Sequence, residues 1–175
     1  MIAQHIGAQF PDRVTALVLS NGVAWAAPAV SALWHERVAE ADRNGMHSQV
    51  EPTLLRWFTE AFRSANAPMV DQIRQLVAAT SPKGYRQAGL AIASLDNRAL
   101  LPRITAPTLL IAGEADGAAP ASAITAMADE IPCSNLVILP GAHLLNVERS
   151  AEYSNILTGF LDEVHQPAEP EANGG

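Results

Sequence analysis

Two continuous apolar runs in this chain each lead into a residue suited to acid–base chemistry. The run 107–113 is followed after a short loop by Asp116, and the run 135–140 is followed by His143. Mainly apolar runs of this length that end in a turn are typical of β-strands. The two residues are about one strand–helix unit apart, so we expect the carboxylate and the imidazole at the same edge of neighbouring strands.

The rest of the chain predicts further elements of a small α/β fold. A third apolar run at 14–20 ends at the turn-forming Asn21-Gly22. Pro52, Pro68 and Pro82 are expected in the first turns of their helices, where the missing N–H costs no hydrogen bond. Apolar spacing of three and four residues predicts helices over the remaining segments. These segments are 2–10, 31–43, 51–64, 68–79, 82–95, 120–131 and 149–164.

This order of elements predicts an α/β domain with a helical insertion. Residues 1–29 and 96–165 are expected to form the core, with about three parallel strands and flanking helices. Residues 30–95 are expected to form a helical lid over the carboxyl ends of the strands, where parallel sheets bind ligands. The Pro-, Glu- and Gly-rich tail at 166–175 is expected to be disordered.

Composition and charge narrow the function classes. The 175 residues are 49% hydrophobic and 17% charged, which is typical of a globular chain with a sizeable core. No run approaches the ~18–20 apolar residues of a membrane span, and the start lacks the pattern of a signal peptide. The net charge of -7, with arginines spread singly, argues against a nucleic-acid partner. The single Cys133 excludes an internal disulfide and fits a cytoplasmic protein.

Asp116 and His143 each have a simpler interpretation than catalysis. Asp116 could cap the helix that starts near Pro120, and a lone histidine is more often a surface or core residue than a base. Their matched positions after neighbouring strands favour a carboxylate that orients an imidazole. None of the ten serines lies in a Gly-x-Ser-x-Gly segment. Since the sequence has no His-Glu-x-x-His segment and no Cys/His cluster, a metal site is not expected.

Several motifs occur in an order that is found in one enzyme family. Phe10-Pro11-Asp12-Arg13-Val14 leads into the apolar run at 14–20, Arg56-Trp57-Phe58 lies in the helical segment, and His143-x-x-Asn146-Val147-Glu148-Arg149 follows the run at 135–140. With Met1-Ile2-Ala3-Gln4 at the start, they resemble the α/β-hydrolase family, and more closely its 3-oxoadipate enol-lactonases, over about residues 1–163. The resemblance implies the C-terminal part of an α/β-hydrolase fold.

The resemblance also implies a catalytic triad and a substrate class. Asp116 would be the triad acid and His143 the general base, and the serine would lie just upstream of Met1. The implied reaction is hydrolysis of a small lactone or ester in the β-ketoadipate pathway of aromatic-compound degradation, and it needs no cofactor.

Residues around the predicted site are candidates for contact with the substrate. Trp25 stands where family members often carry Lys or Arg, which would suit a substrate carboxylate. Arg37 or Arg56 could supply that charge instead. Trp34, Trp57 and Phe58 are predicted to line an apolar pocket, although a tryptophan in a helical layer is as often a core residue.

Two alternatives stay open on the sequence alone. Carboxylesterases, dehalogenases and C–C bond hydrolases share the fold and differ at the nucleophile or in the lid. A non-catalytic fragment or pseudoenzyme is the second alternative, because the chain would lack both the serine and the oxyanion-hole loop. The run at 14–20 would then expose an unpaired strand edge of about seven residues, so self-association through this edge is a further expectation.

Overall fold

A parallel sheet of three strands organises residues 1–165, the part of the chain that the computed structural model describes. The register places Leu17 opposite Thr108, so neighbouring strands end at the same edge of the sheet. The structure confirms the predicted parallel strands, and the predicted tail at 166–175 lies outside the described residues. In spatial order the strands are β1 (Leu17–Ser20), β2 (Thr108–Gly113) and β3 (Ser134–Leu139).

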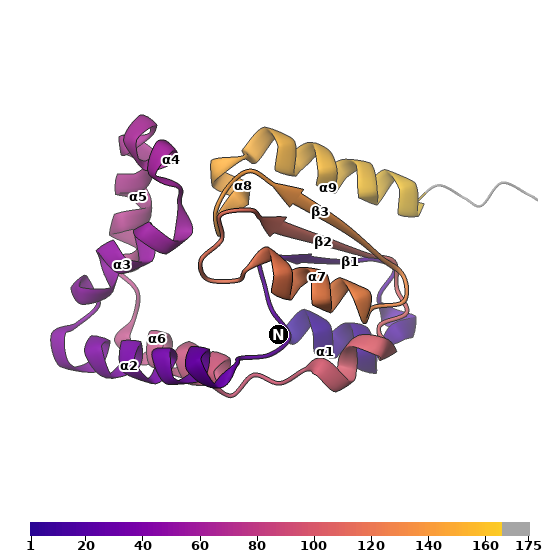
Figure 1. Cartoon of the computed structure of the whole chain (residues 1–175), viewed down its shortest axis with the longest axis horizontal. Helices are drawn as coiled ribbons and strands as arrows, with labels where there is room; N and C mark the ends of the chain where they lie inside the picture. The colour runs from indigo at the N-terminus through magenta and orange to yellow at the C-terminus, as the bar shows by residue number, and fades with distance from the viewer. Residues whose placement is uncertain (166–175) are drawn as a thin grey trace, which may run out of the picture.

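Helices cover both faces of β2, which explains the uninterrupted apolar sequence of that strand. Leu110 and Ala112 pack in one cluster with Ile124, whereas Leu109 packs in a separate cluster with Phe160. Alternate side chains of a strand point to opposite faces. Figure 1 accordingly shows α8 and α9 on one face of the sheet and α1 and α7 on the other. The bounds are α1 (Ile2–Gln9), η1 (Pro11–Arg13), η2 (Arg98–Arg103), α7 (Ala121–Asp129), α8 (Leu145–Glu148) and α9 (Ser150–His165).

Helices α2 to α6 form a separate layer, called here the helical region (28–93). Its own apolar core contains Leu54 and Phe58, each 1% exposed. Leu144 and Val147, which follow β3, pack against this core, and Figure 1 shows the region beyond the carboxyl ends of the strands. The bounds are α2 (Pro28–Asn44), α3 (His47–Trp57), α4 (Glu60–Ala65), α5 (Ala67–Ala78) and α6 (Pro82–Ala93).

The helix predicted over 51–64 is wrong in two respects. The chain breaks at Phe58, whose backbone is extended, and Thr59 starts α4 by accepting the N–H of Phe62 on its hydroxyl. The break follows from tertiary packing, because Phe58 turns into the core of the helical region. Pro52 also lies in the interior of α3 rather than in its first turn, because the helix begins earlier, at His47.

The strand predicted over 14–20 is shorter than expected. β1 contains only four residues, because a 3-10 turn over 11–13 leads into the strand and pairing begins where Leu17 donates to the carbonyl of Pro107 at 2.9 Å. The edge that the sequence predicted at about seven residues is therefore reduced to four. Self-association through this edge stays a proposal.

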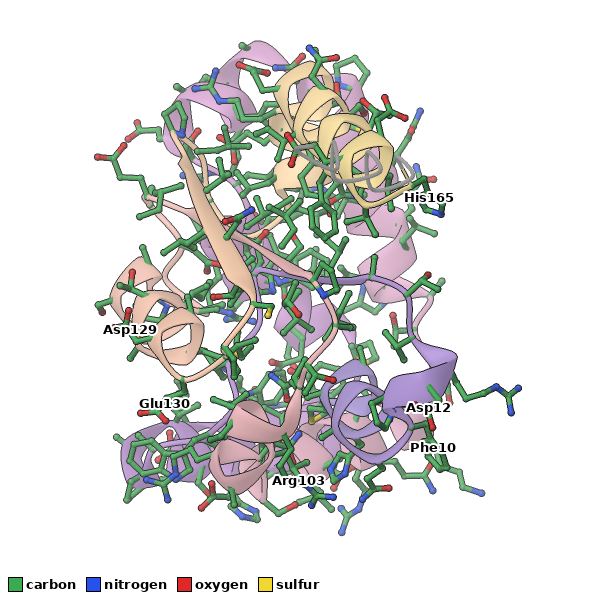
Figure 2. All side chains as sticks on the ribbon, turned by 90° about the vertical axis from the view of Figure 1, so that its right-hand side faces the viewer. Phe10, Asp12, Arg103, Asp129, Glu130 and His165 are labelled. Carbon is green, nitrogen blue, oxygen red and sulfur yellow. The ribbon has the colours of Figure 1, made fainter. Side chains whose placement is uncertain are left out.

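Exposed charged groups lie at the end of the sheet where the strands begin, opposite to the carboxyl ends of the strands. Figure 2 shows Asp12, Arg103, Asp129 and Glu130 at the outside of this end, on α7 and on the short turns beside α1. Asp116 and His143 lie instead at the carboxyl edge of the sheet, which faces the helical region.

Candidate active site

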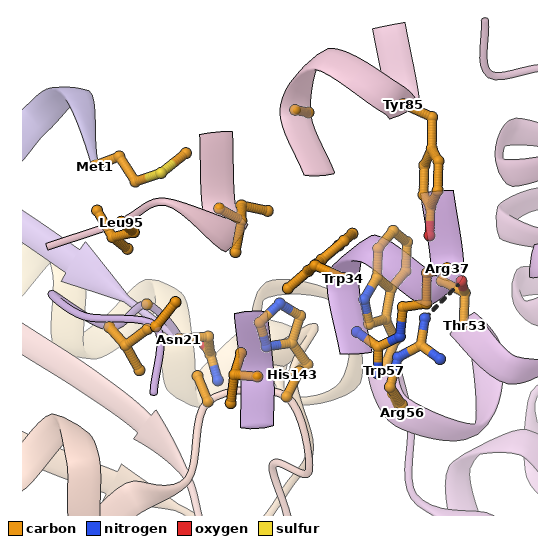
Figure 3. A pocket seen from close by; sticks show the side chains of 18 of the residues that line it. Met1, Asn21, Trp34, Arg37, Thr53, Arg56, Trp57, Tyr85, Leu95 and His143 are labelled. Atoms are coloured by element: carbon orange, nitrogen blue, oxygen red, sulfur yellow. Dashed lines mark hydrogen bonds between the residues drawn. The ribbon is translucent and has the colours of Figure 1, made fainter. Parts of the chain in front are cut away.

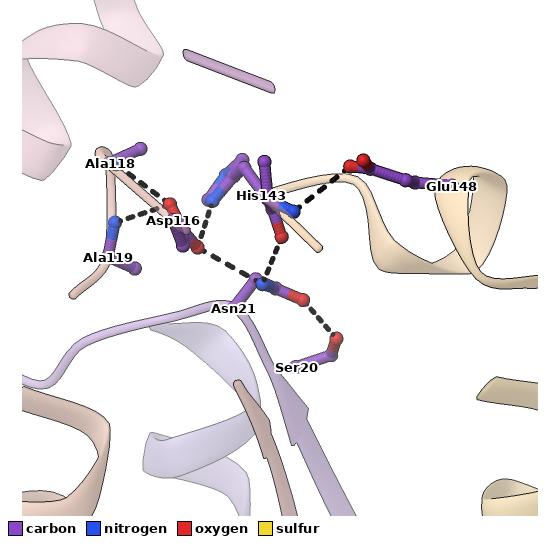
Figure 4. Close-up of polar contacts among 8 residues, drawn as sticks. Ser20, Asn21, Asp116, Ala118, Ala119, His143 and Glu148 are labelled. Atoms are coloured by element: carbon purple, nitrogen blue, oxygen red, sulfur yellow. Dashed lines mark hydrogen bonds and ion pairs between the residues drawn. The ribbon is translucent and has the colours of Figure 1, made fainter. Parts of the chain in front are cut away.

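Asp116 and His143 meet at the carboxyl edge of the sheet. Asp116 lies in the loop after β2 and His143 in the loop after β3, and Nδ1 of the imidazole is 2.9 Å from Oδ2 of the carboxylate (Figure 4). The Asp116 side chain is fully buried, whereas the His143 side chain is 25% exposed. Nε2 of His143 makes no hydrogen bond to any described residue and therefore remains available to a ligand.

Hydrogen bonds surround the Asp116 carboxylate. Oδ1 accepts the N–H of Ala118 at 2.7 Å and that of Ala119 at 2.9 Å, and Oδ2 accepts the side-chain amide of Asn21 at 3.0 Å. Burial raises the pKa of Asp116, but the bonds from His143, Ala119 and Asn21 lower it, and the net direction is downward. The group is therefore an ionised acceptor suited to hold the Nδ1–H tautomer of His143.

Asn21 joins the Asp116–His143 pair, although its place in the sequence predicted only a turn. It follows β1 with a left-handed φ of 48°, a conformation that asparagine tolerates better than most residues. Its amide also donates to the carbonyl of Ala142 at 3.2 Å, next to His143, while its oxygen accepts the Ser20 hydroxyl at 2.8 Å. One side chain therefore connects the loop after β2 that carries Asp116, called here the acid loop, with the loop after β3 that carries His143, called here the base loop.

The base loop packs directly on the backbone at the end of β2. A Cβ atom at Gly113 would lie 2.2 Å from the carbonyl oxygen of Ala142, so only glycine fits there. Two polar residues of the motif that begins at His143 have different surroundings. Asn146 is exposed, whereas Glu148 is half-buried and accepts the N–H of Ala142 at 3.0 Å.

A cavity of about 430 Å³ opens beside His143, between the sheet edge and the helical region. Figure 3 shows His143 and Asn21 on one side of it and Arg37, Arg56 and Tyr85 on the other. Its walls are mainly apolar, as in most small-molecule sites. The sheet part of the wall includes Met1, Val23, Leu95 and Ala118, and the helical part includes Val30, Met46, Val77, Ala88 and Ile92.

Two arginines line the cavity without a carboxylate partner among residues 1–165. Arg37 lies over the ring of Trp34, with 5.1 Å from its guanidinium carbon to the ring centroid. Arg56 donates to the hydroxyl of Thr53 at 3.0 Å. Burial lowers the pKa of both arginines, and the neighbouring charge of Arg37 lowers that of Arg56 further. Each guanidinium retains unused donors beside the cavity.

The structure brings most of the predicted contact residues to this cavity. Trp34, Arg37, Arg56 and Trp57 line it, and the Trp57 ring stacks on His143 with 6.3 Å between the centroids. Trp25 and Phe58 depart from the prediction, and Phe58 is buried in the core of the helical region.

Trp25 instead borders a second hollow, together with Leu101 and Met127. It is 40% exposed, lies under the guanidinium of Arg98 and pairs through its backbone with Asp96. This pairing keeps its side chain out of the cavity beside His143.

Residues 1–165 contain neither a candidate metal site nor a candidate membrane-spanning helix. No group of three or more His, Cys, Asp or Glu side chains is placed to hold a metal ion in this part of the chain. None of its helices has the length and apolar character needed to cross a membrane.

Comparison with known proteins identifies the family. The family model described as alpha/beta hydrolase fold matches residues 1–150. The chain belongs to the α/β-hydrolase family. A curated relative, 3-oxoadipate enol-lactonase 1 of Acinetobacter baylyi, is 33% identical over 134 residues, which are 75% of this chain and 49% of that protein. This α/β-hydrolase chain therefore spans about half the length of the curated relative.

Solved structures agree with this assignment. A hydrolase from Pseudomonas aeruginosa PA01 is 34% identical, with a TM-score of 0.86, over 91% of this chain and 60% of that one. The enol-lactonase from Burkholderia xenovorans LB400 is 28% identical, with a TM-score of 0.88, over 91% of this chain and 61% of that one. The chain is thus an α/β hydrolase by fold and by sequence.

Proposed function

We propose that this chain supplies the acid, the base and the substrate cavity for hydrolysis of a lactone or ester, of the 3-oxoadipate enol-lactonase type. The observation that carries the proposal is the Asp116–His143 pair, which faces a mainly apolar cavity with two arginines across it. In this proposal Asp116 and His143 are the second and third members of a triad, and the helical region (28–93) acts as the lid.

The geometry supports general base catalysis by His143. Ionised Asp116 holds the Nδ1–H tautomer, so Nε2 carries the lone pair that takes a proton from the attacking hydroxyl. After the carbonyl is attacked, the imidazolium that Asp116 stabilises returns this proton to the leaving oxygen. A second cycle with water releases the acid product. The 175 residues contain no Gly-x-Ser-x-Gly segment, so the proposed serine lies outside them.

The arginines support a substrate that carries a carboxylate. Arg37 and Arg56 present guanidinium donors in a mainly apolar cavity, and such donors match a carboxylate in geometry and charge. An enol-lactone with an acidic side chain would place its carboxylate there and its ring carbonyl beside His143. This arrangement favours a lactonase of the β-ketoadipate pathway over a carboxylesterase for neutral esters.

Hydrolysis of 3-oxoadipate enol-lactone by two forms tests the proposal. One form is the 175-residue chain, and the other is extended upstream of Met1 in the same reading frame. We expect the extended form to hydrolyse the lactone and its His143→Ala variant to lose that activity. Equal activity with and without His143 would overturn the proposal.

A second candidate is a carboxylate-binding protein without turnover. The absence of a Gly-x-Ser-x-Gly segment from the sequence favours it. Under this candidate the lactone and its product bind, with an affinity that depends on Arg37 and Arg56, but neither form hydrolyses the lactone. Calorimetric titration beside the hydrolysis assay separates the two candidates.

A further inference from the structure

Glu148 makes contacts that the proposed chemistry does not use. Its carboxylate lies between the base loop and the start of α4. Oε2 accepts the N–H of Ala142 at 3.0 Å. Oε1 accepts the N–H of Thr59 at 3.3 Å and also the Thr59 hydroxyl. Figure 4 shows the Glu148 carboxylate reaching the backbone beside His143. Thr59 is 89 residues away in sequence, so one half-buried carboxylate joins the base loop to the helical region.

Two more contacts join the same segments. The N–H of Leu144 donates to the carbonyl of Trp57 at 3.0 Å. The rings of His143 and Trp57 stack with an interplanar angle of 28°. The consecutive residues 142–144 thus all lie against the junction between α3 and α4, either directly or through the Glu148 carboxylate.

We propose that Glu148 is a positioning residue that sets the orientation of the His143 ring by docking the base loop on the junction at 57–59. The proposal rests on the proposed function only for the role of His143 as a base. The orientation of the ring is measurable without turnover, so the two proposals can fail separately.

The chemistry of the partners explains why a carboxylate suits this position. The Ala142 N–H, the Thr59 N–H and the Thr59 hydroxyl all act as donors, and an ionised carboxylate offers only acceptors. A glutamine would turn an NH₂ group toward at least one donor, and an alanine would leave all of them without Glu148. Because Trp57 also borders the cavity next to Arg56, the same docking fixes the spacing between the base and the arginines.

The fluorescence of Trp57 provides a local test. The chain has three tryptophans, so the double substitution W25F/W34F leaves Trp57 as the single source of tryptophan fluorescence. A stacked imidazolium quenches indole emission, so the emission should show a step as His143 titrates with pH. The H143A variant assigns the step, because it should abolish it. We expect E148A to lose most of the step, E148Q to retain part of it, and E152A, which removes an exposed carboxylate, to retain all of it.

The outcomes separate positioning from a general structural role. If folded E148A has a lower melting temperature but an unchanged step, the proposal is overturned. If E148A does not fold, E148Q decides: a reduced step supports the proposal and an unchanged step overturns it. If the variants change the emission step as expected but the extended form does not hydrolyse the lactone, the proposed function is contradicted and the positioning role of Glu148 stands.

Discussion

The two sides of the cavity differ in the burial and the pairing of their charged groups. On the sheet side, Asp116 is fully buried and accepts hydrogen bonds from Asn21, Ala118 and Ala119, with His143 beside it. On the helical side, the arginines are half-buried and have no carboxylate partner among residues 1–165. The sheet side therefore holds its groups in one orientation before a ligand arrives, whereas the helical side leaves donors for the ligand. The predictions below test this division.

Loss of the Asp116 charge should have the largest effect. Asp116→Asn preserves the shape of the side chain but no longer holds the His143 tautomer that leaves Nε2 free. We expect hydrolysis by the extended form to fall on the order of 10,000-fold, measured as kcat. Asp129→Asn, at an exposed position, should leave kcat unchanged. A loss below about tenfold at Asp116 would show that the pair does not act as acid and base.

Gly113 at the sheet edge and Gly89 in the helical region should differ in how well they tolerate substitution by alanine. A Cβ at Gly113 would meet the backbone oxygen of Ala142 at 2.2 Å, whereas one at Gly89 would meet a methyl of Val38 at 2.7 Å. The Val38 methyl group belongs to a side chain and the Ala142 oxygen to the backbone, and alanine is also a better helix former than glycine within α6. We expect Gly113→Ala to destabilise the fold by about 3 kcal/mol and Gly89→Ala by about 1 kcal/mol. Denaturant melts would contradict the account if Gly89→Ala had the larger effect.

The arginines should govern the recognition of a charged substrate rather than the chemical step. Arg37→Gln and Arg56→Gln each remove a charged donor, which typically contributes about 1.5–3 kcal/mol. We expect KM for a lactone acid to rise roughly 10- to 100-fold in each variant, with little change for the methyl ester of the same acid. The exposed Arg43→Gln is the matched control. Equal losses for acid and ester would remove the proposed carboxylate contact.

Two substitutions separate the contribution of the Asn21 amide hydrogen bonds to stability from that of its left-handed backbone conformation. Asn21→Ala loses the amide bonds to Asp116 and Ala142 and keeps an unfavourable φ of 48°, whereas Asn21→Gly loses only the amide. We expect alanine to lower the free energy of unfolding by about 2 kcal/mol and glycine by about 1 kcal/mol. Equal losses, measured by urea titration, would mean that the backbone conformation contributes nothing.

The pKa of Asp116 predicts a modest loss of stability in acid. Because hydrogen bonds to its ionised form lower its pKa in the folded state, the carboxylate stabilises the fold above the unfolded value of about 3.9. This contribution disappears as the pH falls from there through the lower folded value. We expect the melting temperature of the chain to fall more steeply over this range than that of Asp116→Asn. Parallel curves would contradict the assigned direction.

The sequence predicted the elements whose signals are local. The three strands and the positions of Asp116 and His143 follow from continuous apolar runs and from the geometry of parallel strands. The role of Asn21 could not be assigned, because its partner Asp116 is 95 residues away and no local pattern reveals that contact. A Ser-Asn pair at the end of a buried strand is the one signal that could have drawn attention to it.

Other errors have tertiary causes. Trp25 was expected at the cavity, but backbone pairing with Asp96 and contact with Arg98 hold it elsewhere. The break of the predicted helix at Phe58 depends on a core contributed by several helices. Periodicity in a single segment does not reveal such contacts.

The tautomer of His143 is the most direct test of the preset acid–base pair, and nitrogen NMR of the ¹⁵N-labelled 175-residue chain measures it. At a pH where the ring is neutral, we predict a protonated Nδ1 and an unprotonated Nε2 for His143, and a shift toward the Nε2–H tautomer in Asp116→Ala. An Nε2–H tautomer in the unmodified chain, or a spectrum of His143 that does not respond to Asp116→Ala, would contradict the account.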